Sequence, residues 1–203
     1  MSLKFVREFI AQPQMVGALW PSSPRLARAM CDAVPLDVAR HVLEIGPGTG
    51  VFTREILARL SRDARLLAVE KNEALAIEVG RTCLRAEVVA GCATELVNCL
   101  RRKNFPAPEV VVSGLPWAAF GGELQQLILD QVVAIGGETS VFVTFAYFGP
   151  HWLPKGRAFR ARLEATFHKV ERLPVVVRNL PPAFVYRASG KRCAFQADAV
   201  RVC

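Results

Sequence analysis

A glycine-rich turn between two apolar runs constrains the fold of this 203-residue chain more than any other feature. The apolar run 42–45 ends in the turn 46–50, Gly-Pro-Gly-Thr-Gly, and a helical pattern begins at once at Val51. A second apolar run, 66–69, ends in Glu70. A strand, a glycine turn, a helix and a strand that ends in an acid form the first half of a nucleotide-binding α/β unit.

The residue types in this unit suit a ligand that contains a ribose. Glycine lets the backbone turn sharply and lets a ligand approach with no Cβ in the way. The carboxylate of Glu70 accepts hydrogen bonds, and a ribose offers two hydroxyl donors. The turn and the acid together predict a nucleotide-like cofactor at the ends of the first two strands.

Strand patterns and helical patterns alternate along most of the chain. We expect strands at 41–45, 64–70, 87–90, 110–113 and 140–147, with helices at 51–60, 72–84, 93–102 and 122–135. This alternation predicts a largely parallel sheet with both faces covered. In the helix 122–135 we expect Leu124, Leu127, Ile128 and Ile135 to face the core, and Gly136-Gly137 to end it.

The pattern changes after Tyr147. Residues 155–169 suit a basic helix with Phe159, Leu163 and Phe167 on one face. Two β-rich runs, 170–178 and 183–187, follow it and are joined by 179–182, which predicts an antiparallel hairpin at the sheet edge. We therefore expect one α/β domain with a seven-stranded, mostly parallel sheet in residues 36–203.

Residues 1–35 are expected to form a helical cap on this core. Residues 2–11 place Leu3, Phe5, Val6, Phe9 and Ile10 on one helical face, which suits either a lid that touches lipid or a helix packed on its own domain. After a loop, Ser22 or Ser23 can cap a second helix with Pro24 in its first turn. That helix should run to about residue 34, with Leu26, Ala29, Met30 and Ala33 facing inward.

Composition and charge narrow the class of protein. Hydrophobic residues make up 52% and charged residues 22%, which argues against disorder. The formal charge of +8 favours an anionic partner, either nucleic acid or a membrane surface with acidic lipids, although a merely basic protein has the same property. No apolar run approaches about 18–20 residues, so we expect no transmembrane helix.

The cysteines and the N-terminus indicate the compartment. None of the six cysteines forms a C-x-x-C pair and no histidine cluster accompanies them, so we expect no metal site. Free cysteines suit a reducing cytosol. The charges at Lys4, Arg7 and Glu8 argue against a signal peptide.

The spacing G-x-G-x-G, preceded by Glu44, resembles motif I of class I S-adenosylmethionine (SAM)-dependent methyltransferases. The resemblance implies a Rossmann-like fold and SAM as the cofactor. It also implies that Gly46, Gly48 and Gly50 meet the methionine and sugar parts of SAM, that Glu44 orients the loop and that Glu70 binds the ribose hydroxyls. The remaining cofactor-binding candidates are Lys71, Cys92, Ala93 and Ser113.

Two short segments depart from family patterns. Cys92 stands where these methyltransferases usually have an aspartate for the adenine amino group, and a thiol is a weaker acceptor. Backbone groups would then hold the adenine, or SAM affinity would be reduced. Residues 113–117, Ser-Gly-Leu-Pro-Trp, resemble the Asn-Leu-Pro-Tyr motif of rRNA adenine dimethyltransferases, but Ser113-Gly114 replaces the asparagine, which weakens the case for an adenine substrate.

A resemblance to bacterial phospholipid N-methyltransferases covers nearly the whole chain. The segments that carry it are 16–23, 43–53, 113–116, 144–147 and 179–183. Members of that family methylate phosphatidylethanolamine toward phosphatidylcholine. Cys92 and Ala146, where the family tends to have aspartate and threonine, leave the exact lipid open, and a related amine lipid such as ornithine lipid is an alternative.

This resemblance and the chemistry of amines select the site candidates. A primary ammonium with a pKa near 10 must lose a proton before it accepts a methyl group, through desolvation or a base. The catalytic candidates are Ser113, Tyr147 and Trp117, of which Ser113 and Tyr147 would hold the amine or pass its proton to water. The substrate-binding candidates are Trp20, Ser22, Ser23, Leu115, Pro116, Trp117, Tyr147 and Asn179.

Aromatic and basic side chains suit the products and the lipid. Aromatic faces bind methylated ammonium ions. The candidates for such a contact are Trp20, Trp117, Tyr147, Phe148 and Trp152. Core packing is the alternative for each of them, and for Phe148 it is what we expect. Lipid phosphates would pair with Lys155, Arg157, Arg160, Arg162 and Lys169. Among the histidines, we expect a structural role for His41, an exposed position on the basic helix for His168, and a possible base in His151.

The sequence thus predicts a cytoplasmic enzyme at the inner face of the membrane, with an amine phospholipid and an anionic membrane surface as partners. Nucleic acid is the less favoured partner, through an rRNA adenine N6-methyltransferase. A third reading is a protein that binds SAM but has lost catalysis, for which Cys92 is the argument. The sequence does not define the oligomeric state or the number of methyl groups added.

Overall fold

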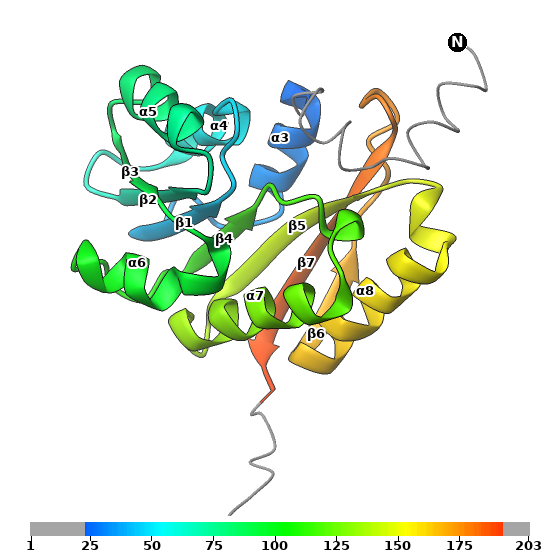
Figure 1. Cartoon of the computed structure of the whole chain (residues 1–203). Helices are drawn as coiled ribbons and strands as arrows, with labels where there is room; N and C mark the ends of the chain where they lie inside the picture. The colour runs from blue at the N-terminus through cyan, green and yellow to red at the C-terminus, as the bar shows by residue number, and fades with distance from the viewer. Residues whose placement is uncertain (1–22, 193–203) are drawn as a thin grey trace, which may run out of the picture.

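The computed structural model describes residues 23–192, which form one sheet with helices on both faces (Figure 1). The helix expected at 2–11 lies outside the described residues, as do the site candidates Trp20 and Ser22. Within the described residues, no helix is both long and apolar enough to cross a membrane.

The sheet has seven strands in the order β3-β2-β1-β4-β5-β7-β6. These are β1 (His41–Ile45), β2 (Arg65–Glu70), β3 (Ala86–Ala90), β4 (Val110–Ser113), β5 (Val141–Tyr147), β6 (Phe167–Arg172) and β7 (Ala183–Lys191). The first five strands pair in parallel, and β7 pairs antiparallel with both β5 and β6. The predicted parallel sheet with a C-terminal antiparallel hairpin at its edge is confirmed.

Within residues 23–192, six α-helices cover the two faces of this sheet. They are α3 (Pro24–Asp32), α4 (Val51–Arg59), α5 (Glu73–Thr82), α6 (Leu96–Arg102), α7 (Gly122–Ile135) and α8 (Pro154–Thr166). Three short 3-10 helices are η1 (Ala93–Glu95), η2 (Trp117–Ala119) and η3 (Pro150–Trp152). Figure 1 shows α3, α4 and α5 on one face and α6, α7 and α8 on the other.

The central strands β2, β1, β4 and β5 are buried on both sides, which is typical of a parallel sheet. Side chains alternate along β1, so that Leu43 and Ile45 join the apolar cluster under α6, α7 and α8. Val42 joins the second cluster, under α3 and α4. Each face thus has its own core, and the carboxyl ends of the strands remain for a site.

The helix α3 begins where the sequence predicts but buries a different side. Ser23 is its N-cap, because the Ser23 hydroxyl oxygen accepts a hydrogen bond from the Leu26 N–H at 3.2 Å. The helix ends at Asp32, and Leu26 and Met30 are buried as expected. Ala27 and Cys31 complete the buried side, whereas Ala29 and Ala33 only pack at its margin.

The helix α7 has the predicted bounds, but its buried face is rotated. Ile128 and Ile135 face the core, whereas Leu124 and Leu127 are exposed, which corrects the prediction for these two. Gln125 is buried in their place because its amide donates to the Trp117 carbonyl at 2.7 Å. A hydrogen-bonded polar side chain therefore takes a core position that hydrophobicity alone assigns to leucine.

The C-terminal elements change from helix to strand earlier than expected. The helix α8 ends at Thr166, so Phe167, His168 and Lys169 lie in β6 and not on the basic helix. Phe167 still reaches the core, where its ring stacks on Phe142 with a centroid distance of 5.7 Å. The strand β6 ends at Arg172, and β7 continues to Lys191, because it pairs with all of β5 up to Ser189 and with Phe167 of β6 at Lys191.

Candidate active site

The loops that carry the motif residues lie together at one edge of the sheet. They follow the carboxyl ends of four adjacent strands, β3, β2, β1 and β4. The order of the strands along the chain reverses between β1 and β4, and ligands of such sheets bind at this switch point. The fold therefore brings the glycine turn, Glu70, Cys92 and Ser113 to one edge of the sheet, where folds of this kind have their ligand crevice.

Three glycines of the turn have left-handed backbone angles. The φ values are +71° at Gly46, +55° at Gly48 and +77° at Gly50, which strain any other residue. A Cβ on Gly46 would lie 2.8 Å from Leu115 Cδ2, whereas a Cβ on Gly48 would meet nothing within 4 Å. Gly46 is thus needed for packing, and the backbone at Gly48 borders open space that a ligand can approach.

The glycine turn also approaches the turn after β4 through its backbone. The Gly114 N–H donates to the Ile45 carbonyl at 2.8 Å. A Cβ on Gly114 would lie 2.6 Å from the Gly46 carbonyl oxygen. Glycine at position 114, where rRNA adenine dimethyltransferases have other residues, is therefore required by this close approach.

The Glu70 carboxylate holds the glycine turn in place. It is buried, and its Oε2 accepts from the Gly48 N–H at 3.0 Å while Oε1 accepts from the Asn72 N–H at 2.9 Å. A carboxylate has about four lone-pair sites, so two acceptor sites remain for ribose hydroxyls. Lys71, beside it, is exposed. The sequence pattern did not indicate Asn72, whose role here is carried by its backbone.

Glu44 is buried in β1, and neither of its carboxylate oxygens has a hydrogen-bond partner of normal geometry among the described residues. Burial raises the pKa of Glu44 to about 8, and the adjacent Thr53 opposes this only in part. The loop amide at Gly48 is bound by Glu70, and the role of Glu44 in orienting the loop stays a prediction. The unpartnered carboxyl beside the glycine turn fits a site whose remaining hydrogen bonds come from a cofactor.

Cys92 follows β3 and is half-buried. Its Sγ accepts a hydrogen bond from the Thr94 hydroxyl at 3.1 Å, and this bond lowers the pKa of the thiol. Ala93, the next residue, begins η1. The thiol lies at the edge where the adenine is expected, and its reduced acceptor strength there remains a prediction.

Ser113 and Trp117 lie deeper than the sequence predicts. Both are buried, and the Trp117 indole N–H donates to Ser113 Oγ at 3.1 Å. The Trp117 ring stacks on Phe159 with a centroid distance of 4.8 Å. The 3-10 turn after Pro116 directs this ring into the core, so Trp117 has no free face for a methylated amine, and its role is to hold the Ser113 turn.

The backbone of the same turn offers one free acceptor. The carbonyls of Ser113, Leu115 and Pro116 accept hydrogen bonds from other parts of the chain. The Gly114 carbonyl accepts none within residues 23–192. An amine placed at this edge can therefore donate to Gly114. Side-chain contacts of Leu115 and Pro116 with a substrate stay a prediction.

Tyr147 ends β5, the neighbour of β4 in the sheet. It is partly buried, and burial raises the pKa of its phenol. The phenol therefore keeps its proton at neutral pH, and its oxygen can accept a hydrogen bond as well as donate one. This placement agrees with a residue that holds an amine and not with a phenolate base.

Ser23 and Asn179 contact each other and not the open edge. The Ser23 hydroxyl donates to Asn179 Oδ1 at 2.6 Å, and Asn179 Nδ2 donates to the Pro181 carbonyl at 2.6 Å. Asn179 is buried. Its amide thus joins α3 to the loop 173–182, and substrate binding by these two side chains stays a prediction.

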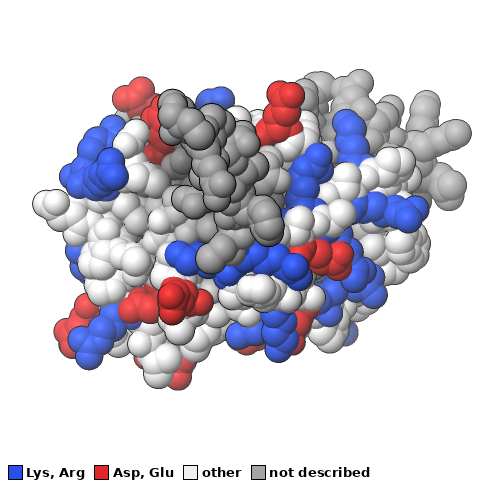
Figure 2. Space-filling view, turned by 90° about the horizontal axis from the view of Figure 1, so that it is seen from below, with Lys and Arg blue, Asp and Glu red and all other residues white. Residues whose placement is uncertain are grey.

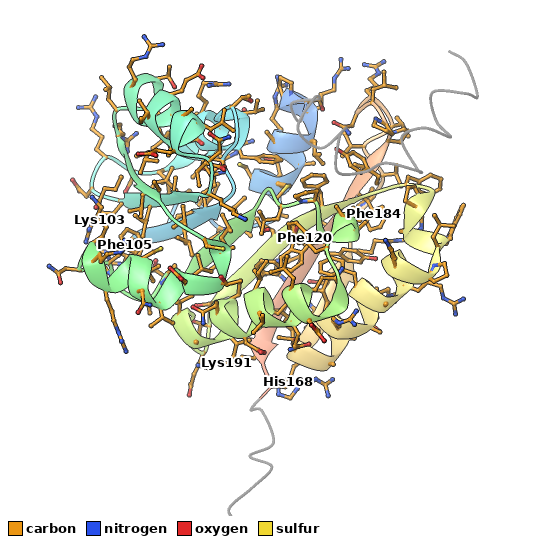
Figure 3. The ribbon with its side chains drawn as sticks, in the orientation of Figure 1. Lys103, Phe105, Phe120, His168, Phe184 and Lys191 are labelled. Atoms are coloured by element: carbon orange, nitrogen blue, oxygen red, sulfur yellow. The ribbon has the colours of Figure 1, made fainter. Side chains whose placement is uncertain are left out.

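The aromatic and histidine candidates separate into core and surface groups. Phe148 and Trp152 are exposed, so the expected core packing of Phe148 is wrong. His41 is structural as expected, since it packs edge-on against Phe105 (Figure 3). His168 is exposed, though on β6. His151 is buried and its Nδ1 accepts from the Gly149 N–H, so this nitrogen is not a free base.

The five basic candidates do not form one surface. Arg157 and Arg160 line a cavity on α8. Arg162 turns toward α7, where it donates to Gln125 Oε1 at 3.1 Å, and Lys169 pairs with Glu171 at 3.0 Å on β6. Lys155 is exposed. Seen from below, Lys and Arg outnumber Asp and Glu over the end of the molecule where α8 and β6 lie (Figure 2).

Comparisons with known proteins agree with this site. The family model of protein-L-isoaspartate(D-aspartate) O-methyltransferase (PCMT) matches residues 4–93. The O-methyltransferase from Bacillus cereus, solved in complex with SAH, has the same fold: the TM-score is 0.64 at 16% identity, over 90% of this chain and 89% of that one. The fold and the glycine crevice thus define an α/β methyltransferase.

Two relatives refine this class. The ornithine lipid N-methyltransferase of Singulisphaera acidiphila is 30% identical over 197 residues, which are 94% of this chain and 97% of that protein. The ribosomal RNA small subunit methyltransferase A of Deinococcus radiodurans is 36% identical over 120 residues, 58% of this chain and 37% of that protein. The chain belongs to the class I SAM-dependent methyltransferase family, and SAM is its cofactor.

Proposed function

We propose that this protein transfers a methyl group from SAM to the amine of a lipid head group. The observation that carries the proposal is the similarity to the ornithine lipid N-methyltransferase, which spans nearly the full length of both chains. The similarity to the rRNA methyltransferase spans little more than a third of that protein. Phosphatidylethanolamine and ornithine lipid are the two candidate substrates, because both present a primary amine.

The residues at the crevice suit such an amine. Bound SAM supplies a methyl group activated by its sulfonium. The Gly114 carbonyl and the Tyr147 phenol oxygen are acceptors at the ends of neighbouring strands, and two fixed acceptors orient an amine toward a methyl donor held by the glycine turn. The buried surroundings of Tyr147 disfavour a charged ammonium, which promotes loss of its proton to water.

We further propose that the enzyme works at the inner surface of a membrane with anionic lipids. The chain carries a formal charge of +8, and a cationic protein is attracted to such a surface. A lipid amine at the surface is within reach of an enzyme bound there without extraction of the acyl chains.

A radiolabel assay tests the substrate class. The full chain is incubated with methyl-labelled SAM and with vesicles that contain phosphatidylethanolamine or ornithine lipid, or with small-subunit rRNA. We expect label in one of the lipid fractions. The absence of label from every amine lipid would overturn the proposal. Tyr147→Phe should reduce the rate at least tenfold, whereas Gln126→Ala, on the exposed side of α7, serves as the control.

An rRNA adenine N6-methyltransferase is the second candidate, and the 36% identity over 120 residues favours it. The replacement of the asparagine by Ser113-Gly114 opposes it, since Ser113 is buried and hydrogen-bonded to Trp117. Label in rRNA and not in lipid would support this second function.

A further inference from the structure

A cationic cavity lies next to η3, which follows the carboxyl end of β5. It has a volume of about 460 Å³ and is formed by η3, α8, β6 and β7. Three arginines, Arg157, Arg160 and Arg172, line it together with one carboxylate, Glu164. None of the cofactor-loop residues lines this cavity. The binding of SAM therefore does not explain why cationic side chains line this cavity.

Two of the three arginines have no carboxylate partner among the described residues. Arg160 pairs with Glu164 at 2.8 Å. The Arg157 guanidinium makes no hydrogen bond or ion pair with any residue between 23 and 192. The Arg172 guanidinium lies 5.3 Å from the ring centroid of Phe184, which Figure 3 labels, and no carboxylate contacts it. Unpaired guanidinium groups around one cavity suit an anion with several oxygens.

His151 adds a donor to the same wall. Its Nδ1 accepts from the Gly149 N–H at 3.1 Å, and burial and then Arg172 lower the pKa of the ring, which is therefore neutral. The proton of a neutral ring must then sit on Nε2. This Nε2 lies 3.4 Å from Arg172 Nη1, so two donors stand side by side, and the Tyr147 backbone also forms a hydrogen bond with the ring. One phosphate oxygen satisfies both.

The rim of the cavity is apolar and exposed. Trp152 and Leu153 are 64% and 44% exposed, and Phe148 contacts Trp152 with a ring-centroid distance of 5.1 Å. The Phe148 N–H donates to the Pro182 carbonyl at 2.8 Å, which joins this turn to the loop that carries the exposed Leu180. Exposed tryptophan and leucine beside cationic groups are typical of a surface that enters the lipid interface.

We propose that Arg157, Arg172 and His151 bind the phosphate of an anionic phospholipid, and that Trp152 and Leu153 enter the bilayer interface beside it. A soluble phosphate needs no apolar rim, and a nucleic acid uses aromatic faces but gains little from exposed leucines. The site goes beyond methyl transfer, because its lipid need not carry an amine and is not consumed.

Vesicle sedimentation without SAM and without amine lipid tests this site separately from methyl transfer. The vesicles contain phosphatidylcholine alone or with phosphatidylglycerol. We expect the wild-type chain to bind the phosphatidylglycerol vesicles and R157Q/R172Q to bind them about 10- to 30-fold more weakly. Each arginine near an anionic surface contributes about fivefold in vesicle affinity, and the variant removes two. Both arginines are exposed, and circular dichroism verifies that the variant is folded.

The matched control R62Q/R81Q removes the same charge. Arg62 and Arg81 are exposed and lie near α4 and α5, on the other side of the sheet from α8 (Figure 1). We expect this control to bind phosphatidylglycerol vesicles within about threefold of the wild type, as a site of defined residues requires.

Four results would overturn the proposal. The first is that the wild type does not bind phosphatidylglycerol vesicles, and the second is that both double variants lose vesicle binding equally. The third is that R157Q/R172Q binds these vesicles as strongly as the wild type. The fourth is that only the binding of a soluble anion depends on Arg157 and Arg172. Calorimetry with inorganic phosphate and a filter assay with an rRNA fragment distinguish the last case. Loss of phosphate or RNA binding in R157Q/R172Q, with vesicle binding intact, would assign the cavity to that ligand.

Discussion

The Ser23 hydroxyl donates a hydrogen bond of 2.6 Å to Asn179 Oδ1 and so joins residues 156 positions apart. The same hydroxyl oxygen accepts from the Leu26 N–H as the N-cap of α3. The Asn179 side chain in turn donates to the Pro181 carbonyl. This chain of hydrogen bonds fastens α3 to the loop between β6 and β7. Ser23 and Asn179, which lie in two of the segments that resemble phospholipid N-methyltransferases, are thus part of one structural unit.

The first prediction concerns this unit. Asn179→Ala leaves the Ser23 hydroxyl and the Pro181 carbonyl without their partner in a buried place, so we expect the free energy of unfolding to fall by about 1–3 kcal/mol in urea denaturation. Asn98→Ala, on the exposed side of α6, should change it by less than about 0.5 kcal/mol.

A double-mutant cycle separates the Ser23–Asn179 contact from other effects. If the hydrogen bond acts as described, S23A and N179A should be non-additive by at least about 0.5 kcal/mol. Additive losses would show that the two side chains stabilise the protein independently. In either case SAM binding should be retained, because neither residue belongs to the glycine crevice.

Local sequence patterns predict the sheet and the cofactor crevice well. The glycine turn and the strands β1, β2, β4 and β5 are fixed by contacts with neighbours in the chain and by burial on both faces. Such features leave a readable pattern in short windows. The helix α7 has the expected bounds for the same reason.

The misplaced residues are those whose role depends on a distant partner. Trp117 faces the core because its indole N–H donates a hydrogen bond to Ser113 and its ring stacks on Phe159 of α8. Asn179 is buried because Ser23 meets it from the other end of the chain. No periodicity in one segment reports these contacts. A resemblance to a motif marks such residues as important but does not tell whether they touch a ligand.

The second prediction concerns Gly48. In Gly48→Ala the new Cβ projects into the open space beside the glycine turn, at a φ of +55°. We expect SAM affinity to fall at least tenfold by calorimetry and the free energy of unfolding to fall by about 1–2 kcal/mol. Gly121→Ala, at φ −67° and with nothing within 4 Å, should leave SAM affinity unchanged. Wild-type affinity in G48A would place the cofactor elsewhere.

The third prediction follows from Glu44. Burial raises its pKa from 4.5 in the unfolded chain to about 8 in the fold, so between these pH values the folded protein binds more protons than the unfolded one. This group therefore lowers stability as the pH rises from about 4.5 to about 8, by roughly a few kcal/mol in total. In Glu44→Gln that decline should disappear.

Urea denaturation of both proteins at pH 5, 6, 7 and 8 measures this effect. The difference in unfolding free energy, variant minus wild type, should rise steadily with pH across the series. Glu123→Gln, on the exposed side of α7, should show no such trend. A constant difference between E44Q and the wild type would mean that the buried carboxyl does not titrate in this window.

The fourth prediction restores an acceptor at position 92. Cys92 lies half-buried after β3, where the resemblance places the adenine, and its thiol is a weak acceptor that already receives the Thr94 hydroxyl. In Cys92→Asp the carboxylate has enough lone pairs to accept hydrogen bonds from both the Thr94 hydroxyl and the adenine amino group. A hydrogen bond to a charged group contributes about 1.5–3 kcal/mol, so we expect SAM to bind at least tenfold more tightly in calorimetry.

Cys92→Ser has a similar size without the charge and should change the affinity by less than about threefold. An unchanged or weaker affinity in C92D would show that backbone groups alone hold the adenine at this edge, and that the cysteine is not the reason for a weaker site.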